Sequence, residues 1–364
     1  MALKGKIRMK SLERVNCAID HQQPDRTPID LRFAPEMLAK LLVELKMDEA
    51  QFWEWAGQDV YTVRPKYKNP ATPIKYADPT IEIDKDGHYL DIYRVPFQNV
   101  STGVQVYLEP LDLPPLKGID TMEGIDAFPW PTVDAWDYSH ISQEIDGRKD
   151  KAVWPRSRGC FQTAQLMRGM ERFLVDLALE PDFACCIMDH VLDFVIEDAR
   201  CSIEASQGKY TYVEYNDDVA TQRGMLISPR MWKKYVKPRM KKFCDMVHGY
   251  GLKVKYHSCG SIYDIIPDLI ETGVNILNPI QVLAANMDPF KLKTEFGKDL
   301  CFHGAIDIQN LLPNGSKQEV KDYVQRIIDV VGKDGGYILA GTHTIQSDSK
   351  VENVITMIET ARTL

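Results

Sequence analysis

The sequence predicts an α/β protein whose 364 residues form a single (β/α)8 TIM barrel domain. The first observation is that short apolar runs alternate with longer amphipathic stretches from about residue 150, as βα units around a parallel sheet do. The second is that the number and length of these units suit a closed barrel better than a doubly wound sheet. The third is that no glycine-rich phosphate loop supports the doubly wound alternative.

The N-terminal part is predicted to contain a helix, a short strand and a second helix. The helix covers residues 11–20, with Ser11 as its N-cap. The turn at residues 23–26 leads into a strand at 27–31, and residues 35–47 are predicted to be helical.

Residues 60–150 are predicted to form a β-rich insertion or cap over the C-terminal face of the barrel. Residues 81–84 and 89–93 flank the pair Asp86-Gly87, which favours the turn of a β-hairpin. The region therefore differs in character from the βα units that follow it.

The βα units after residue 150 complete the predicted barrel. The strands are expected at residues 152–155, 210–215, 253–257, 274–277, 300–303 and 337–340. The helices are expected at residues 170–179, 183–204, 229–249, 262–271, 289–296, 317–331 and 351–363.

Composition and charge exclude several classes of partner. The net charge is −8 without any basic block, which argues against nucleic acid. Neither a signal peptide nor a run of about 18 apolar residues is found, so we expect a cytoplasmic protein with no membrane contact. The eight cysteines are scattered, so we expect buried thiols rather than disulfides.

The most informative pattern is Tyr256-His257-Ser258-Cys259-Gly260, which follows a short apolar run. His257 and Cys259 are two residues apart, so both side chains point to the same face of an extended segment. Imidazole and thiolate are preferred ligands of tetrahedral zinc. The pair therefore predicts part of a zinc site whose third ligand comes from elsewhere in the chain.

Polar side chains follow five consecutive predicted strands. In a barrel of this kind the chemistry lies at the C-terminal ends of the strands. Each of these residues alone is more often an ordinary loop residue, but acid, imidazole and thiol groups together favour an active site. The residues are Glu214, Asn216, Asp217, Asp218, His257, Cys259, Asn278, Gln281, His303, Asp307, Thr342 and His343.

Four residues are candidates for the third zinc ligand: His343, Cys301, His303 and Glu214. Cys301 lies early in a predicted strand, where packing is expected, and His303 is equally consistent with an interior histidine. His343 lies where the last predicted strand ends. We favour His257, Cys259 and His343 as ligands, with Glu214 or a water in the fourth position.

From about Tyr210 onward, the sequence resembles the uroporphyrinogen decarboxylase superfamily. The resemblance is carried by residues 257–260, 268–275, 304–307 and 352–354, and residues 24–28 are similar to the opening of that superfamily. It covers roughly half of the chain well and residues 60–150 poorly. Members are (β/α)8 barrels, so the resemblance implies the same fold.

The resemblance favours one of two branches of the superfamily. Decarboxylases that act on uroporphyrinogen carry an arginine-rich N-terminal segment, whereas residues 29–35 hold only Arg32. Corrinoid-dependent methyltransferases bind zinc with a His-x-Cys motif and a later cysteine. His257 and Cys259 match that motif, and His343 stands where the later cysteine is expected.

A histidine at position 343 makes the expected zinc more Lewis-acidic, which suits an ether oxygen. The resemblance therefore implies an O-demethylase methyltransferase, which moves a methyl group from a methoxylated aromatic compound (an aryl methyl ether) to the cob(I)amide of a corrinoid protein. The chain has no Asp-x-His-x-x-Gly sequence that would hold a cobalamin, so the corrinoid should arrive on a separate partner protein. A homodimer is compatible with this interpretation.

The remaining polar residues receive predicted roles in this scheme. The candidate catalytic residues are Glu214, Asp217 and His303, and Asp218 is expected to order its loop. Trp53, Trp55 and Asp59 precede the cap and could line its entrance. The candidate substrate-binding residues are Asn216, Tyr256, Asn278 and Gln281.

Three alternatives stay open. A methyltransferase that methylates a thiol, or that takes methyl from a methylamine, would share the fold and the zinc. A uroporphyrinogen-type decarboxylase would be metal-free. A non-catalytic binding protein of this fold would have lost the site residues, and the His257, Cys259 and His343 set argues against it.

Overall fold

The core of the fold is a parallel sheet. A computed structural model describes residues 9–71, 80–101, 106–148 and 150–363. Six strands are hydrogen-bonded in the order β16-β15-β14-β13-β10-β9. Their bounds are β9 (Arg156–Arg158), β10 (Tyr212–Asn216), β13 (Lys253–His257), β14 (Ile276–Ile280), β15 (Cys301–Ile306) and β16 (Tyr337–Gly341).

Further hydrogen bonds close this sheet into the predicted (β/α)8 barrel. β8 (Ala152–Trp154) continues into β9 and pairs in parallel with β1 (Val60–Thr62). The Asp59 amide donates to the Ile29 carbonyl, and the Asp30 amide donates to the Leu339 carbonyl in β16. The extended segment at residues 28–31 is therefore the first strand, and it links β1 to β16.

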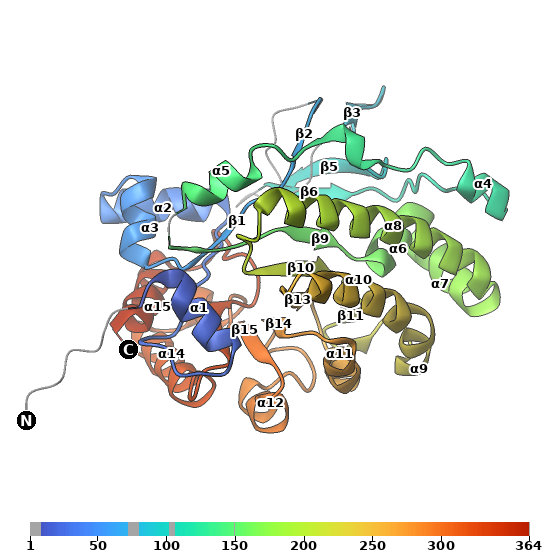
Figure 1. The fold of residues 1–364 in the computed structure, drawn as a ribbon. Coiled ribbons are helices and arrows are strands. Elements are labelled where there is room, and N and C mark those ends of the chain that lie inside the picture. Colours follow the sequence, from blue (N-terminus) through green and yellow to red (C-terminus); the bar gives the residue numbers. More distant parts are fainter. Residues whose placement is uncertain (1–8, 72–79, 102–105, 149, 364) are drawn as a thin grey trace, which may run out of the picture.

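Helices lie outside the strands, as Figure 1 shows for α10, α11, α12 and α14. The predicted helices at residues 170–179, 289–296 and 351–363 are confirmed with the same bounds, whereas α3 and α6 were not predicted. Helix 229–249 is interrupted by a π-helical turn at Trp232–Val236, next to Pro238, which lacks an amide donor. The helices are α1 (Ser11–Ile19), α2 (Pro35–Leu45), α3 (Glu49–Ala56), α6 (Cys160–Arg168), α7 (Met170–Leu179), α8 (Pro181–Ser206), α9 (Pro229–Met231), α10 (Lys237–Gly249), α11 (Ile266–Thr272), α12 (Pro289–Phe296), α13 (Leu311–Asn314), α14 (Lys317–Val330) and α15 (Val351–Thr363).

A small apolar cluster fills the N-terminal end of the barrel. It contains the first residues of several strands together with Val15 and Ile19 of α1, so α1 closes this end. Cys301 belongs to this cluster, as predicted. Ser11 is the first helical residue of α1 rather than its N-cap. The polar chemistry is left to the opposite end of the barrel.

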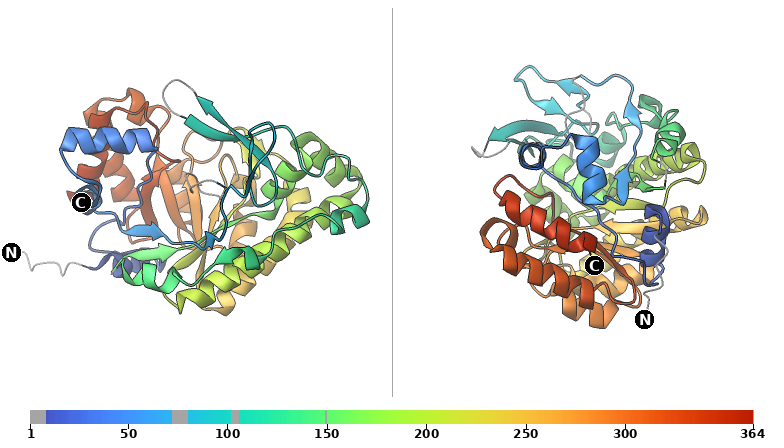
Figure 2. Two further views of the ribbon diagram at one scale, coloured as in Figure 1. Left: turned by 90° about the horizontal axis from the view of Figure 1, so that it is seen from above. Right: turned by 90° about the vertical axis from the view of Figure 1, so that its left-hand side faces the viewer.

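The region between β1 and β8 contains the predicted β-structure. β3 (Glu82–Ile83) and β4 (Tyr89–Leu90) form the predicted hairpin, and β5 (Pro96–Ser101) and β6 (Val106–Pro110) extend it to a four-stranded antiparallel sheet. This sheet lies at the top in Figure 1 and in the right-hand view of Figure 2, on the opposite side from α12 and α14. The region also contains β2 (Lys66–Tyr67), β7 (Trp136–Asp137), α4 (Met122–Asp126) and α5 (Ile141–Asp146).

The boundary of this region differs from the predicted one. β1 was assigned to the insertion, but it pairs with β8 inside the barrel. A strand of three residues is too short to show a pattern of its own. Arg158, at the C-terminal end of β9, donates to Asp91 (2.6 Å), so the region meets the barrel at this rim. Residues 72–79, 102–105 and 149 of the predicted insertion lie outside the described residues.

A membrane-spanning segment was also sought. Within the part of the chain that the structure describes, no helix has both the length and the apolar character needed to cross a bilayer.

Candidate active site

The His-x-Cys pair lies at the C-terminal end of β13, as predicted. His257 Nε2 lies 3.7 Å from Cys259 Sγ and 3.9 Å from Asp218 Oδ1. The Asp218 carboxylate also accepts the Cys259 amide (2.7 Å). One ligand atom from each of the three residues lies within 4.8 Å of the others. Asp218 was expected to order its loop, and the structure adds it to the candidate metal ligands.

Asn278 orients the imidazole of His257. The two residues are register partners on β14 and β13, and Asn278 Oδ1 lies 2.6 Å from His257 Nδ1. We assign the proton to Nδ1, because an amide oxygen is an acceptor. Nε2 is then unprotonated and faces Cys259 and Asp218. Asn278, predicted as a substrate-binding residue, thus has the role of the hydrogen-bond acceptor that usually accompanies a metal-binding histidine.

His343 lies at the same cavity but outside this close group. A small cavity of about 50 Å³ is lined by His257, Asn278, His303 and His343, among others. His343 is exposed on the loop that follows β16. Of the predicted trio, His257 and Cys259 are in contact, and His343 lines the same small cavity as His257.

The electrostatics of the pair fit a divalent cation. Burial lowers the pKa of His257, so its imidazole is neutral and can act as a ligand. Burial, together with the Asp218 charge, raises the pKa of the Cys259 thiol. A metal ion would favour the thiolate by supplying the missing positive charge. Nitrogen, sulfur and oxygen donors in one half-buried group match the ligand set of zinc.

A charged cluster occupies the barrel interior beneath this mouth. Lys255 Nζ lies 2.7 Å from Glu214 Oε2, and the two side chains are 0% and 1% exposed. The ammonium also lies 3.6 Å from the ring centroid of Trp154. Arg156 and Arg32 approach the Glu214 carboxylate at 3.7 and 4.0 Å. Glu214 is thus surrounded by cations.

These cations decide the protonation state of Glu214. Burial alone raises the pKa of Glu214, but Lys255 and Arg32 outweigh it and lower the pKa to about 2. The group is therefore ionised at neutral pH. An ionised carboxylate has no proton to give to a leaving oxygen, and the close metal group contains Asp218 rather than Glu214.

His303 pairs with Asp30 inside the barrel. Its Nε2 lies 3.1 Å from Asp30 Oδ2, and burial lowers the pKa of His303 to about 4. β15 runs on to Ile306, so His303 is inside the strand rather than at its end. The histidine lines the small cavity as a neutral group, which leaves it available as a hydrogen-bonding residue.

Asp217 caps a helix instead of facing the cavity. Its carboxylate accepts the Phe161 amide (3.3 Å) and the Gln162 amide (2.7 Å) at the start of α6. A Cβ at Gly159 would lie only 2.1 Å from the Asp217 side chain, so this approach requires glycine. Burial raises the pKa of Asp217 to about 7, but the group is fully buried and bonded to backbone. Its position is that of a structural residue.

Two predicted substrate-binding residues are also held within the protein. Tyr256 is 0% exposed and donates its hydroxyl to the Asp217 carbonyl (3.1 Å). Gln281 accepts the Gly260 amide (2.7 Å) and the Gln222 side-chain amide (3.0 Å), which ties neighbouring loops together. Asn216 lies at the end of β10, opposite His257 in register. Asn216 therefore remains beside the site, whereas Tyr256 and Gln281 shape it indirectly.

Lys255 and Arg156 were not predicted from the sequence as site residues. Lys255 precedes His257 by two residues, so it points to the same face of β13, and it lies opposite Glu214 in register. A lysine between apolar residues at an inward position was the available signal. Arg156 and Arg32 also line a cleft of about 1110 Å³ that reaches Trp53.

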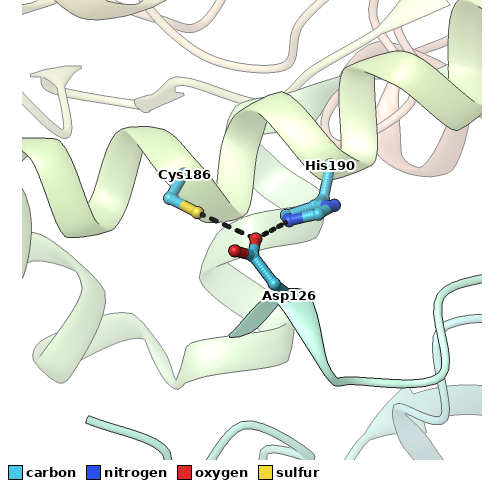
Figure 3. Close-up of side chains that lie close together, drawn as sticks. All are labelled: Asp126, Cys186 and His190. Atoms are coloured by element: carbon cyan, nitrogen blue, oxygen red, sulfur yellow. Dashed lines mark hydrogen bonds and ion pairs between the residues drawn. The ribbon is translucent and has the colours of Figure 1, made fainter. Parts of the chain in front are cut away.

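A second group of potential ligands lies on the outer surface. Figure 3 shows the Asp126 carboxylate between the Cys186 and His190 side chains of α8. Asp126 Oδ1 lies 2.7 Å from His190 Nε2 and 3.9 Å from Cys186 Sγ. Asp126 is 63% exposed, and its ion pair with His190 accounts for the contact without a metal. The group matters as a competitor in any measurement of bound metal.

Comparisons with known proteins agree with the architecture. The model of the uroporphyrinogen decarboxylase (URO-D) family matches residues 147–364, which is more than half of the chain and includes every strand from β8 onward. A solved methyltransferase from Methanosarcina mazei is similar in structure, with a TM-score of 0.67 and 16% sequence identity over 98% of this chain and 99% of that chain. At this identity the likeness shows a shared fold. A search of curated proteins finds no match.

Proposed function

The chain belongs to the uroporphyrinogen decarboxylase (URO-D) family, and from that premise we propose that it is a zinc-dependent methyltransferase. It would move a methyl group from a methoxylated aromatic compound to the cob(I)amide of a separate corrinoid protein. The observation that carries this proposal is the meeting of His257, Cys259 and Asp218 within 4.8 Å at the C-terminal end of the barrel. A decarboxylase that works without metal has no need of this donor set.

The residues proposed to hold zinc are His257 and Cys259, with the third position taken from Asp218 or His343. Asp218 is favoured by distance, and His343 by its place at the same cavity as His257. When bound, zinc would supply Lewis acidity toward the ether oxygen of the methyl donor. The protein itself would orient the Nε2 lone pair of His257 toward the metal through the hydrogen bond between His257 and Asn278.

The proposed methyl transfer does not need a proton from an acid in the barrel interior. The methyl carbon–oxygen bond breaks, its electron pair stays on oxygen as a phenolate, and the electron pair of cob(I)amide forms the new cobalt–carbon bond. Glu214 is ionised and His303 is neutral at pH 7, so neither supplies a proton. When bound at His257 and Cys259, zinc would stabilise the negative charge on the leaving oxygen.

The test is a methyl-transfer assay with free cob(I)alamin as acceptor. The purified protein is mixed with a panel of methoxyaromatic compounds, and methylcobalamin is followed by its absorption spectrum. We expect transfer by the parent protein, loss after chelation, recovery on addition of zinc, and no transfer by His257→Ala. Undiminished transfer by the metal-free protein or by His257→Ala would rule out the zinc mechanism.

A decarboxylase is the second candidate, and one observation favours it. The arginine-rich N-terminal segment is missing from the sequence, yet basic side chains from separate segments converge on the large cleft: Arg32, Arg64, Arg148, Lys151 and Arg156. A substrate with several carboxylates would suit such a surface. Release of carbon dioxide that is indifferent to chelation and to His257→Ala would support this function instead.

A further inference from the structure

The large cleft opens into the barrel beside its first strand. The Leu31 amide donates to the side chain of Gln58 (2.8 Å), which in turn donates to the Val60 carbonyl (2.7 Å). A side chain thus stands between the first strand and β1, where a backbone ladder would otherwise continue. The cleft of about 1110 Å³ lies against these two strands, and it shares Asp30 and Arg32 with the small cavity at His257.

The cleft is basic, although the chain as a whole is acidic. Five basic side chains and three acidic ones line it, in a chain with a net charge of −8. Inside the barrel the imbalance repeats, because among the described residues Arg32, Arg156 and Lys255 face the two carboxylates of Asp30 and Glu214. His303 adds no charge when neutral. One positive charge is therefore left over in a cluster whose Lys255 is buried and whose Arg156 and Arg32 are 27% and 40% exposed, and an anion in the cleft would balance it.

Hydrogen-bond donors in this place lack acceptors at bonding distance. Arg156 Nε and Arg32 Nη2 are buried atoms that make no hydrogen bond in the described structure. The carboxylate oxygens nearest to them lie at 3.7 Å for Arg156 and 3.6 Å for Arg32, which is too long for a good hydrogen bond. The Trp154 indole Nε1 is a third such donor. The neighbouring acceptors Asp30 Oδ2, Glu214 Oε1 and Glu214 Oε2 also lack a partner at bonding distance. An anion that enters the cleft would therefore offer these donors a closer acceptor than the protein does.

Aromatic side chains form much of the remaining wall. Trp53, Tyr61 and Trp154 line the same cleft. Arg32 lies over the ring of Trp154 at 4.8 Å, so the cationic and aromatic surfaces are adjacent. A planar ring that carries an acidic group matches such a combination.

We propose that this cleft binds an aromatic carboxylate, with Arg156 and Arg32 holding its carboxylate group. The identification of that compound as the methyl donor rests on the function proposed above, whereas the anion site does not. The carboxylate end binds at the arginines, and the rest of the ring extends toward the cavity lined by His257. The substrate class is therefore a methoxylated aromatic acid rather than a neutral methoxyarene.

The experiment compares two probes of the same size, 4-methoxybenzoate and its neutral amide, 4-methoxybenzamide. Their affinities for the full-length protein are measured by calorimetry, without corrinoid. A charge-assisted arginine contact predicts that the acid binds about 10- to 100-fold more tightly than the amide. Arg156→Gln should remove this preference by weakening the binding of the acid more than that of the amide, and Arg156→Lys should retain part of it.

The control is Arg200→Gln, because Arg200 is 39% exposed, close to the 40% of Arg32, but lies on the outer face of α8. It should keep the full preference. Arg32→Gln provides a second test if Arg156→Gln fails to fold. Equal affinity for acid and amide, a preference that survives both glutamine variants, or no binding of the acid at millimolar concentration would each overturn the proposal.

The two proposals fail separately. A preference for the acid without methyl transfer would remove the methyltransferase function and keep the anion site. If methyl transfer from the amide were as efficient as that from the acid, the methyltransferase function would stand and the aromatic acid would no longer be the preferred methyl donor.

Discussion

Two polar layers in the same barrel are built on different principles. The mouth layer contains His257 and Asn216, two side chains without a full charge, at the ends of β13 and β10. The interior layer, with Lys255 and Glu214, lies two residues deeper on the same two strands and consists of full charges. Depth along a strand thus separates groups that can accept a metal from groups that must be paired to be buried at all.

The largest expected effect comes from breaking the interior layer. Lys255→Met leaves the Glu214 carboxylate buried without its nearest cation, so we expect a loss of about 3–5 kcal/mol in the free energy of unfolding. The control is Lys241→Met, which breaks the exposed pair with Asp245 and should cost at most about 0.5 kcal/mol. Denaturant unfolding of both variants measures the difference, and equal losses would contradict the distinction.

The interior layer should also make the protein sensitive to acid. The pKa of Glu214 falls from 4.5 to about 2 on folding, so its contribution to stability is complete above pH 4.5 and is lost as the pH falls toward 2. The difference corresponds to about 3 kcal/mol. Glu214→Gln should be less stable at neutral pH, and its free energy of unfolding should fall less steeply between pH 4.5 and 2. A variant with the parent's slope in this range would show that Glu214 titrates normally.

The mouth layer should respond through metal affinity. Asn278→Ala removes the acceptor for His257 Nδ1, and loss of such a partner weakens metal binding by about 10- to 100-fold. Asn278→Asp keeps an acceptor oxygen and should restore most of the affinity. Competition with a zinc-sensitive dye gives the dissociation constants. If Asn278→Ala binds zinc as the parent does, Asn278 does not orient the histidine.

The smallest effect is expected at Asp217. Removal of its cap at the start of α6 by Asp217→Ala should cost about 1 kcal/mol of stability. Zinc content should remain that of the parent, because Asp217 bonds to backbone rather than to the His257 group. Thermal unfolding and metal analysis on the same sample test both statements. Loss of zinc from a stable Asp217→Ala protein would return Asp217 to the active site.

Much of the fold could be predicted from the sequence because the spacing of apolar residues within each helix and strand involves only near neighbours in the chain. The βα alternation after residue 150 and the helices at 170–179 and 351–363 follow from side-chain spacing alone. β1 was misassigned because its three residues carry no pattern. The first strand and β16, joined at Asp30 and Leu339, are far apart in the chain, so only the closed barrel reveals their pairing.

The residues of the candidate site also divide into those that neighbouring positions predict and those that only the folded barrel brings together. His257 and Cys259 could be predicted because two neighbouring residues on one strand carry both ligand types. Tyr256 was misjudged because a strand alternates, so the residue beside an inward histidine faces the helices. Arg32 and Arg156 line the same cleft only after distant strands meet, and the sequence drew attention to Arg32 alone, as the single arginine in residues 29–35.

Zinc at the His257–Cys259 pair is the basis of the proposed function, and the amount of bound zinc is its most direct measure. Metal content is compared among the parent, His257→Ala, Cys259→Ala and a Cys186→Ala/His190→Ala double variant that removes the surface group of Figure 3. We predict about one zinc per chain in the parent and in the double variant, and none in His257→Ala or Cys259→Ala. A parent protein without zinc, or zinc lost only from the double variant, would contradict the central claim.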